Sequence, residues 1–259
     1  RYRGEAVVAL VGARHEVLGV RDDEVPITWT VELPVFGIDA ATAPEAPLVQ
    51  ADKPANLLLE GGVRRGDAAG SFAECAAVAE GVFETAFVEH AYIEPEAGWA
   101  QRVGDRLEIH VTTQTPYMDR DEVANVMRLR PEAVRIVPTA CGGGFGGKLD
   151  LSVHPLIALA AWTLSRPVAC VYTRPESMVA STKRHPARVA ARFGCDADGK
   201  LVACEVTATF DTGAYASWGP TVANRVPVHA TGPYAVPNVR TWGAAYFTNG
   251  PPAGAFRGF

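Results

Sequence analysis

The hydrophobic pattern of the chain predicts more strands than helices. Residues 6–11, AVVALV, form an apolar run suited to a buried strand, and residues 26–33, PITWTVEL, alternate like a second strand. Further strands are expected at about 57–65 and 77–87, and at 105–113, where every second residue is apolar. Much of the backbone should therefore pair in sheets.

Two segments have the pattern of helices. Residues 119–129, DRDEVANVMRL, combine an acidic first turn with apolar side chains at helical spacing. Residues 150–165, DLSVHPLIALAAWTLS, predict a mostly apolar helix that opens with Asp150. Around this second helix we predict a strand at 133–139 and a buried strand at 166–173.

The strongest local signal lies within residues 187–211. Two alternating runs flank Asp198 and Gly199, a dipeptide that favours a hairpin turn. Residues 39–56 are rich in Ala, Pro and Asp and predict a linker, so we place a domain boundary near residue 50. Because strands outnumber helices, we predict an α+β fold with mixed sheets and packed helices, and not a doubly wound sheet.

Composition narrows the function classes. The 259 residues are 48% hydrophobic and 20% charged, and the formal net charge of −5 offers no basic field for nucleic acid or an anionic membrane. No apolar run approaches the roughly 20 residues that a membrane helix needs. Five scattered cysteines without a C-x-x-C pair argue against a disulfide scaffold and a cysteine-ligated cluster. They indicate a reducing compartment, which we expect to be the cytoplasm.

The two ends of the sequence lie inside patterned stretches. The chain starts within RYRGEAVVALVG, which has the pattern of a strand interior, and stops at PPAGAFRGF. We therefore expect a piece of a longer polypeptide, and the alternative is a processed subunit with trimmed ends.

The stretch CGGGFGGKL overlays two nucleotide-binding signatures. Gly142, Gly144 and Gly147 satisfy G-x-G-x-x-G, the dinucleotide fingerprint. The same stretch, ending in Lys148, satisfies most of a phosphate-binding P-loop. However, Leu149 stands where a P-loop carries the hydroxyl that binds magnesium, and no well-placed acid follows the next strand for a ribose.

Both signatures share one physical feature, which does not depend on the residues at which each signature fails. Several glycines let backbone N–H groups approach an electron-rich oxygen near the start of a helix. The alternative is a tight turn that packs against another element. From residues 141–149 alone, both interpretations stay open.

Seven separate stretches carry a resemblance that spans nearly the whole chain. They are FVEHAYIEPEAGWA at 87–100, TTQTPYMDRDEVANVM at 112–127, CGGGFGGKLD at 141–150, STKRHPARV at 181–189, DTGAYA at 211–216, YAVPNVR at 234–240 and PPAGAFRGF at 251–259. In this order, they resemble the molybdopterin-binding subunit of the xanthine dehydrogenase/aldehyde oxidase family of molybdenum hydroxylases.

The resemblance implies an organisation and a chemistry. Residues 1–50 would be the end of a hammerhead-like α/β domain, and residues 51–259 the first of two molybdopterin-binding domains, with the second absent. Such enzymes hydroxylate an aldehyde or an aromatic N-heterocycle with water as the oxygen source. The implied cofactor is molybdenum with molybdopterin, either plain or as the cytosine dinucleotide, and the pterin holds the metal. The implied partners are the rest of the molybdenum subunit, an iron–sulfur subunit with [2Fe–2S] clusters and an FAD subunit.

The resemblance also implies cofactor-binding residues. Gln114 matches a glutamine that hydrogen-bonds near an oxygen ligand of molybdenum, and the alternative is a polar residue at a strand end. Gly144, Phe145 and Gly146 match the loop whose backbone N–H groups reach the cofactor. The Phe145 ring would also shield the metal from water.

Four further positions match the segments around the cofactor and substrate. Arg257 matches a segment that closes over the cofactor, where a guanidinium offsets negative charge. Phe259 matches a ring that sandwiches a planar substrate. Arg225 matches a substrate-pocket arginine of purine-oxidising members, and the alternative is an arginine that bridges strands. Leu149 replaces the glutamate of those members, which disfavours xanthine as the substrate.

The general base of the family is a glutamate that would lie beyond Phe259, so this chain alone should not turn over substrate. Glu89, Glu94 and Glu96 are candidate substitutes, although their stretch is structural in the family. The six histidines lack the spacing of metal ligands, and we expect them to be structural. The competing hypotheses are a non-catalytic scaffold or assembly subunit and a nucleotide-binding module.

Overall fold

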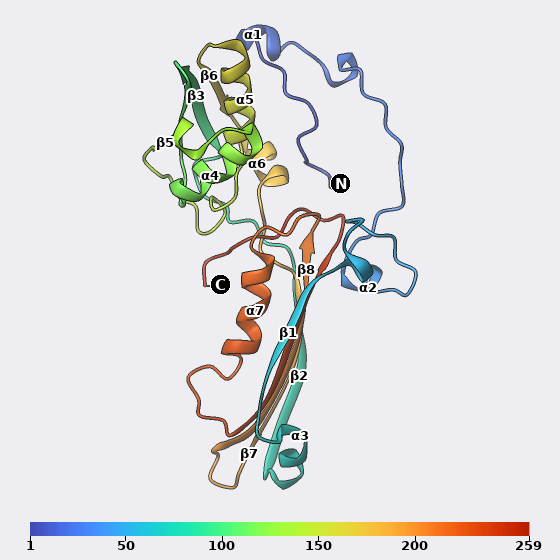
Figure 1. The fold of residues 1–259 in the computed structure, drawn as a ribbon. Helices are drawn as coiled ribbons and strands as arrows, with labels where there is room; N and C mark the ends of the chain where they lie inside the picture. Colours follow the sequence, from blue (N-terminus) through green and yellow to red (C-terminus); the bar gives the residue numbers. More distant parts are fainter. Residues whose placement is uncertain (259) are drawn as a thin grey trace. The chain divides into compact units, whose positions relative to one another are not determined.

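The chain folds as two compact units that are interleaved along the sequence (Figure 1). The computed structural model describes residues 1–258, so Phe259 lies outside the described residues. We name the units by their sheets: the four-stranded unit comprises residues 4–34 and 91–181, and the five-stranded unit comprises residues 1–3, 35–90 and 182–258. The domain boundary near residue 50 stays a prediction, because units defined by contacts are not family domains.

The four-stranded unit is a mixed sheet with helices packed on it. Its elements are β3 Ala97–Val103, β4 Arg106–Val111, α4 Pro116–Met127, β5 Val134–Pro138, α5 His154–Leu164, β6 Val168–Val171 and α6 Arg174–Ala180. The strand order is β5-β4-β3-β6, in which β4 and β5 are parallel and the other pairs antiparallel. The sheet thus confirms the predicted mixture of strand directions.

Alternation along β4 places the core of this unit. Leu107, Ile109 and Val111 all point to one face, where they are buried against Val123 of α4 and Ile157 of α5. Full burial of an apolar side chain of this size contributes about 1.5–3 kcal/mol. This core fixes the ends of β4 and β5, after which Gln114 and the glycine loop follow in the chain.

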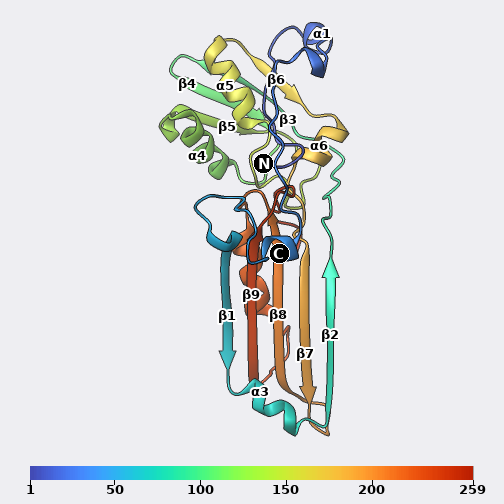
Figure 2. The same ribbon diagram turned by 90° about the vertical axis from the view of Figure 1, so that its right-hand side faces the viewer.

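The five-stranded unit is a long sheet in the order β1-β9-β8-β7-β2, which Figure 2 shows from the face opposite α7. Its main elements are β1 Leu57–Arg65, β2 Ala77–Thr85, β7 Ala187–Cys195, β8 Leu201–Gly213, α7 Gly219–His229 and β9 Asn238–Phe247. The predicted hairpin is confirmed: β7 and β8 pair antiparallel, and Gly199 has a φ of +79° in their turn. The helix packs Ala223 against Ala208 and Phe210 of β8.

The remaining elements are short. They are the α-helical turns α1 Arg14–Val17, α2 Ile38–Ala41 and α3 Ala68–Ser71, and the 3₁₀ turns Asp22–Glu24, Pro54–Asn56, Phe72–Glu74 and Pro131–Ala133. Among the described residues, no helix is long and apolar enough to cross a membrane.

Two of the predicted strands are wrong. Residues 6–11 and 26–33 pair with no strand among the described residues, and Val8, Val31 and Leu33 are exposed. A strand needs a neighbour for its backbone N–H and C=O groups, and an apolar or alternating pattern does not supply one. The predicted buried strand over 166–173 forms only at β6, and Val171 in it is 69% exposed.

The helix boundaries also differ from those predicted. The helix expected over 150–165 begins only at His154, with Pro155 in its first turn, and the Ser152 N–H donates to the His154 Nδ1 atom in an irregular lead-in. The glycine loop therefore does not open directly into a helix. The helix expected over 119–129 begins earlier, at Pro116, since proline suits a first turn. Apart from the short helical turns, β3, α6, α7 and β9 were not predicted.

Candidate functional site

The glycine loop of residues 141–149 connects β5 to the start of α5. Gly143 and Gly146 have φ values of +107° and +106°, which side chains rarely adopt. Phe145, between them, also has a positive φ of +54° and is 41% exposed. A large residue in the left-handed region is unusual, and such backbone strain clusters at binding sites.

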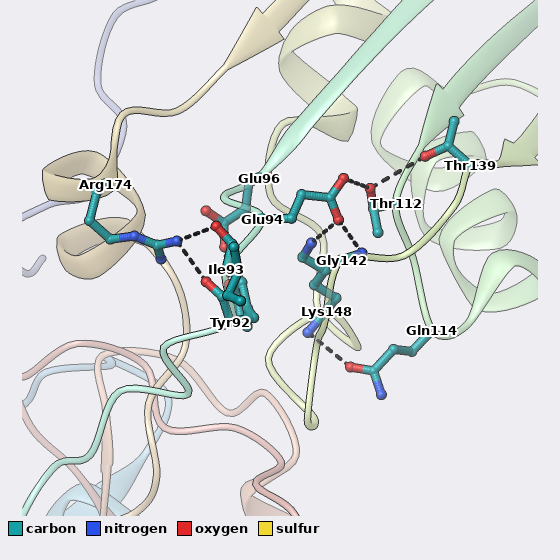
Figure 3. Close-up of polar contacts among 10 residues, drawn as sticks. All are labelled: Tyr92, Ile93, Glu94, Glu96, Thr112, Gln114, Thr139, Gly142, Lys148 and Arg174. Carbon is teal, nitrogen blue, oxygen red and sulfur yellow. Dashed lines mark hydrogen bonds and ion pairs between the residues drawn. The ribbon is translucent and has the colours of Figure 1, made fainter.

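The Glu94 carboxylate anchors the start of this loop (Figure 3). Glu94 Oε2 accepts the Gly142 N–H at 2.7 Å and the Lys148 ammonium at 2.9 Å. Its Oε1 accepts the Thr112 hydroxyl at 2.7 Å. Burial alone raises the pKa of Glu94, but these three donors outweigh it and hold the pKa below its usual range.

Lys148 is the buried cation of this network. It is 5% exposed, and its Nζ atom lies 4.7 Å from the centre of the Tyr92 ring as well as beside Glu94. The fully buried Tyr92 in turn donates its hydroxyl to Glu96, while its carbonyl accepts from Arg174 at 2.6 Å. The ion pair therefore ties both ends of the glycine loop to the segment before β3.

Gln114 holds the other side of the loop. Its Oε1 atom accepts the Gly146 N–H at 3.0 Å and the Lys148 N–H at 3.3 Å, and its backbone N–H donates to the Lys148 carbonyl at 3.1 Å. Two converging N–H donors identify this atom as the oxygen of the amide. The Nε2 group, which can only donate, has no hydrogen-bond partner among the described residues.

Gly144 fits this arrangement only because it lacks a side chain. A Cβ atom there would lie 2.4 Å from the Gln114 Oε1 atom, closer than side-chain carbons approach anything. The structure thus contains a cradle in which backbone and amide lie against each other, with the Gln114 amide donors left over. Such a cradle suits an oxygen-rich ligand, and it fits the cofactor that the resemblance implies.

In the five-stranded unit, buried contacts hold the segment 251–256 that precedes Arg257. The His90 ring donates from Nε2 to the Ala255 carbonyl at 2.7 Å and stacks on Phe256, with ring centres 4.5 Å apart. Burial lowers the pKa of His90 and so favours its neutral form. Lys183 donates its N–H to the Pro252 carbonyl at 3.0 Å and pairs through its ammonium with Glu89 at 2.6 Å.

The site residues expected from the sequence thus fall into three groups. The structure brings together Gln114 and the loop with Gly144, Phe145, Gly146 and the half-buried Leu149. Arg225 and Arg257 belong to the five-stranded unit, while Phe259 is outside the described residues. Arg225 is exposed on α7, so the alternative of an arginine bridging strands is wrong.

Each of the three glutamates considered as a base faces a protein partner. Glu89 pairs with Lys183, Glu94 with Lys148, and Glu96 accepts the Tyr92 hydroxyl. The role of Lys148 as the loop's buried cation was missed by the sequence analysis, because its partner lies 54 residues earlier. The signal that was present, a lysine at the end of a glycine run, had suggested a phosphate ligand instead.

The glycine loop lies against the Gln114 amide, and the buried ion pair of Lys148 and Glu94 holds it in place on a mixed sheet. This arrangement is typical of a cofactor-binding domain of the α+β class. The chain belongs to the molybdopterin cofactor-binding domain family, whose family model matches residues 49–259.

Relatives match along the entire chain. It is 38% identical to the "Nicotinate dehydrogenase large molybdopterin subunit" of Eubacterium barkeri and 36% identical to a probable xanthine dehydrogenase subunit of Bacillus subtilis. The chain spans 61% of the first relative and 35% of the second.

Solved structures show the same fold. The aldehyde oxidoreductase from Desulfovibrio gigas superposes with a TM-score of 0.84 at 28% identity, covering 88% of this chain and 25% of that one. The quinoline 2-oxidoreductase from Pseudomonas putida 86 superposes with a TM-score of 0.80 at 29% identity, covering 88% of this chain and 30% of that one. These neighbours confirm the α+β fold with mixed sheets.

Proposed function

We propose that this chain is part of the molybdenum-cofactor subunit of a molybdenum hydroxylase. Membership of the molybdopterin-binding family and the names of the relatives support this assignment. Within it, residues 1–50 would be the end of a hammerhead-like domain and residues 51–259 the first molybdopterin-binding domain. The start of the family match at residue 49 supports this division.

The Gln114 amide is the observation that carries the proposal. Its oxygen is committed to the Gly146 and Lys148 N–H groups, so its Nε2 donor is oriented and available. A neutral donor of this kind can bind an oxygen of the cofactor without adding charge to the site. When bound, the molybdenum cofactor supplies the redox centre at which a substrate carbon is oxidised. Gln114, the Gly144 amide and Phe145 would bind the cofactor, and the exposed Phe145 ring would exclude water. The Gly146 N–H, expected from the sequence to reach the cofactor, is instead donated to the Gln114 oxygen, so Gly146 would act by holding Gln114 in place.

The substrate we propose is an aromatic N-heterocycle, with an aldehyde as the second class. Leu149 places an apolar side chain beside the glycine loop, where a planar ring gains from contact with it. The relatives named for nicotinate and quinoline support a heterocycle, and the one named for aldehydes keeps the second class open. In this proposal, Arg225 and Phe259 line the substrate pocket and Arg257 contacts the cofactor.

The electrons released by this reaction need a path away from the site. We assign that path to [2Fe–2S] clusters and FAD on partner subunits or domains, with the rest of the molybdenum subunit completing the pocket and supplying the base. The cofactor would be molybdopterin itself or its cytosine dinucleotide. A non-catalytic scaffold is the competing function, and metal content separates the two.

Replacing Gln114 tests the proposed site. In the intact complex, Gln114→Ala should lower the molybdenum content per chain about tenfold or more, because it removes hydrogen bonds worth about 1 kcal/mol each. The matched control is Gln101→Ala, since Gln101 lies on β3 of the same unit and its side chain bonds, among the described residues, only to Glu108. The metal is measured by elemental analysis. Equal molybdenum in the Gln114 variant and the parent would contradict the site.

A further inference from the structure

A buried acid and a buried imidazole face each other between the first turns of α4 and α5. Asp119 is 2% exposed and His154 is 3% exposed, and the Asp119 Oδ2 atom lies 3.6 Å from the His154 Nε2 atom. Both atoms are buried and have no hydrogen-bond partner among the described residues. Two polar atoms left unsatisfied in a core are costly, so a pair of them in contact calls for a role.

The tautomer of His154 follows from its other nitrogen. The Ser152 N–H donates to the His154 Nδ1 atom at 3.2 Å, so Nδ1 carries a lone pair and a neutral ring carries its proton on Nε2. The Nε2 atom that carries this proton lies 3.6 Å from Asp119 Oδ2, in contact and just outside hydrogen-bond distance. The imidazole can therefore serve as a donor to the carboxylate without becoming charged.

The other oxygen of Asp119 connects this pair to Gln114. The Thr115 hydroxyl lies 3.5 Å from Asp119 Oδ1 and equally far from the Leu149 carbonyl, and the Thr113 hydroxyl lies near enough to lower the pKa of the same carboxylate. These two threonines flank Gln114 on either side, and Thr113 Oγ1 accepts the Thr115 N–H at 2.9 Å. One carboxylate thus lies against the hydroxyl side chains on both sides of the residue whose amide supports the glycine loop.

We propose that Asp119 and His154 are a positioning pair that sets the orientation of the Gln114 amide. His154 packs against the Asp119 carboxylate from the α5 side, and the carboxylate lies against the hydroxyls of Thr113 and Thr115. Among the described residues, the pair reaches the glycine loop through Thr113, Thr115 and Gln114, and the Thr115 hydroxyl also lies 3.5 Å from the Leu149 carbonyl of that loop. This inference concerns the chain itself and does not require that a cofactor be bound.

The charge of Asp119 gives the pair a measurable signature. Burial raises the pKa of Asp119 to about 6, while the threonine hydroxyls lower it and the nearby Asp150 carboxylate raises it. Burial lowers the pKa of His154 to about 4, so the imidazole stays neutral while Asp119 titrates. As the pH falls through about 6, the carboxylate gains a proton and loses acceptor capacity, which changes its hold on the two threonines.

The experiment follows the side-chain amide resonance of Gln114 by NMR in the isotope-labelled chain, from about pH 7.5 to about pH 5. The resonance is identified by its loss in Gln114→Ala, and the amide of Gln101 in the same spectra is the internal control. We expect the Gln114 resonance to shift with a midpoint near pH 6, and the shift to be absent in Asp119→Asn.

Two outcomes would overturn the pair: a Gln114 resonance with no inflection in the parent, or the same titration in Asp119→Asn. If Asp119→Asn does not fold, Asp150→Asn provides the second test, because it removes the neighbouring negative charge and leaves the pair in place. It should move the Gln114 midpoint to lower pH, and an unchanged midpoint would count against the proposal. Molybdenum content does not enter this readout, so it separates this inference from the proposed function.

Discussion

Replacing Glu94 with alanine should destabilise the four-stranded unit by about 3 kcal/mol, because a buried cation would lose its carboxylate. Lys148 would keep only the Tyr92 ring, and the Gly142 N–H and Thr112 hydroxyl would each lose an acceptor. A buried donor that loses its acceptor adds about 1–3 kcal/mol when water cannot reach it. Glu94 is partly exposed, so water can reach these donors, and the total destabilisation stays near the figure of about 3 kcal/mol for the broken ion pair. Urea unfolding followed by tryptophan fluorescence measures this change.

Glu132→Ala is the matched control for this variant. Glu132 is an exposed carboxylate of the same unit, and its removal should change the free energy of unfolding by less than about 0.5 kcal/mol. Glu94→Gln should fall between the two, since an amide keeps one acceptor oxygen and loses the charge. If Glu94→Ala were as stable as the control, the ion pair would not anchor the loop.

Replacing Gly144 with alanine should lower cofactor binding more than it lowers the stability of the fold. The new Cβ would meet the Gln114 side chain at 2.4 Å, so the amide must leave the Gly146 and Lys148 N–H groups. Those two hydrogen bonds, about 1 kcal/mol each, hold the amide in its binding orientation, so without them that orientation is populated roughly thirtyfold less and the apparent affinity falls by the same factor. The molybdenum and pterin contents of the purified complex report the effect.

Gly104→Ala controls for the change of residue type. Gly104 has a φ of +63° in the turn between β3 and β4, and a Cβ there would meet nothing within 4 Å. That variant should cost about 1 kcal/mol of backbone strain and leave the cofactor content unchanged. A Gly144 variant with full cofactor would show that the close approach to Gln114 does not serve binding.

The sequence predicted the elements whose signal is local. The hairpin at Asp198 and Gly199 and the alternating strand at 105–113 are set by neighbours in the chain, so their patterns were sufficient. The strands expected at 6–11 and 26–33 did not form, because pairing depends on a partner that a single segment does not encode. Elements such as α7, with proline at position 227, broke the helical pattern and escaped prediction.

The same distinction applies to the candidate site. The glycines of residues 141–149 predicted a close approach of the backbone to another group, and the structure confirms such an approach at Gly144. The groups that contact the loop could not be predicted from the local sequence, because Gln114 lies about thirty residues earlier and Glu94 about fifty. Only the resemblance, which compares whole motifs, suggested Gln114. Neither the local sequence pattern nor the resemblance indicated the pair of Asp119 and His154, since each residue alone is ordinary in its own helix.

The most direct test of the central claim is the cofactor content of the intact protein complex. Elemental analysis for molybdenum, together with quantitation of the pterin after oxidation to its fluorescent form, needs no substrate and no assumption about partners. Binding at the glycine cradle predicts one molybdenum and one pterin for each copy of this chain. An active complex that contains neither would contradict the account.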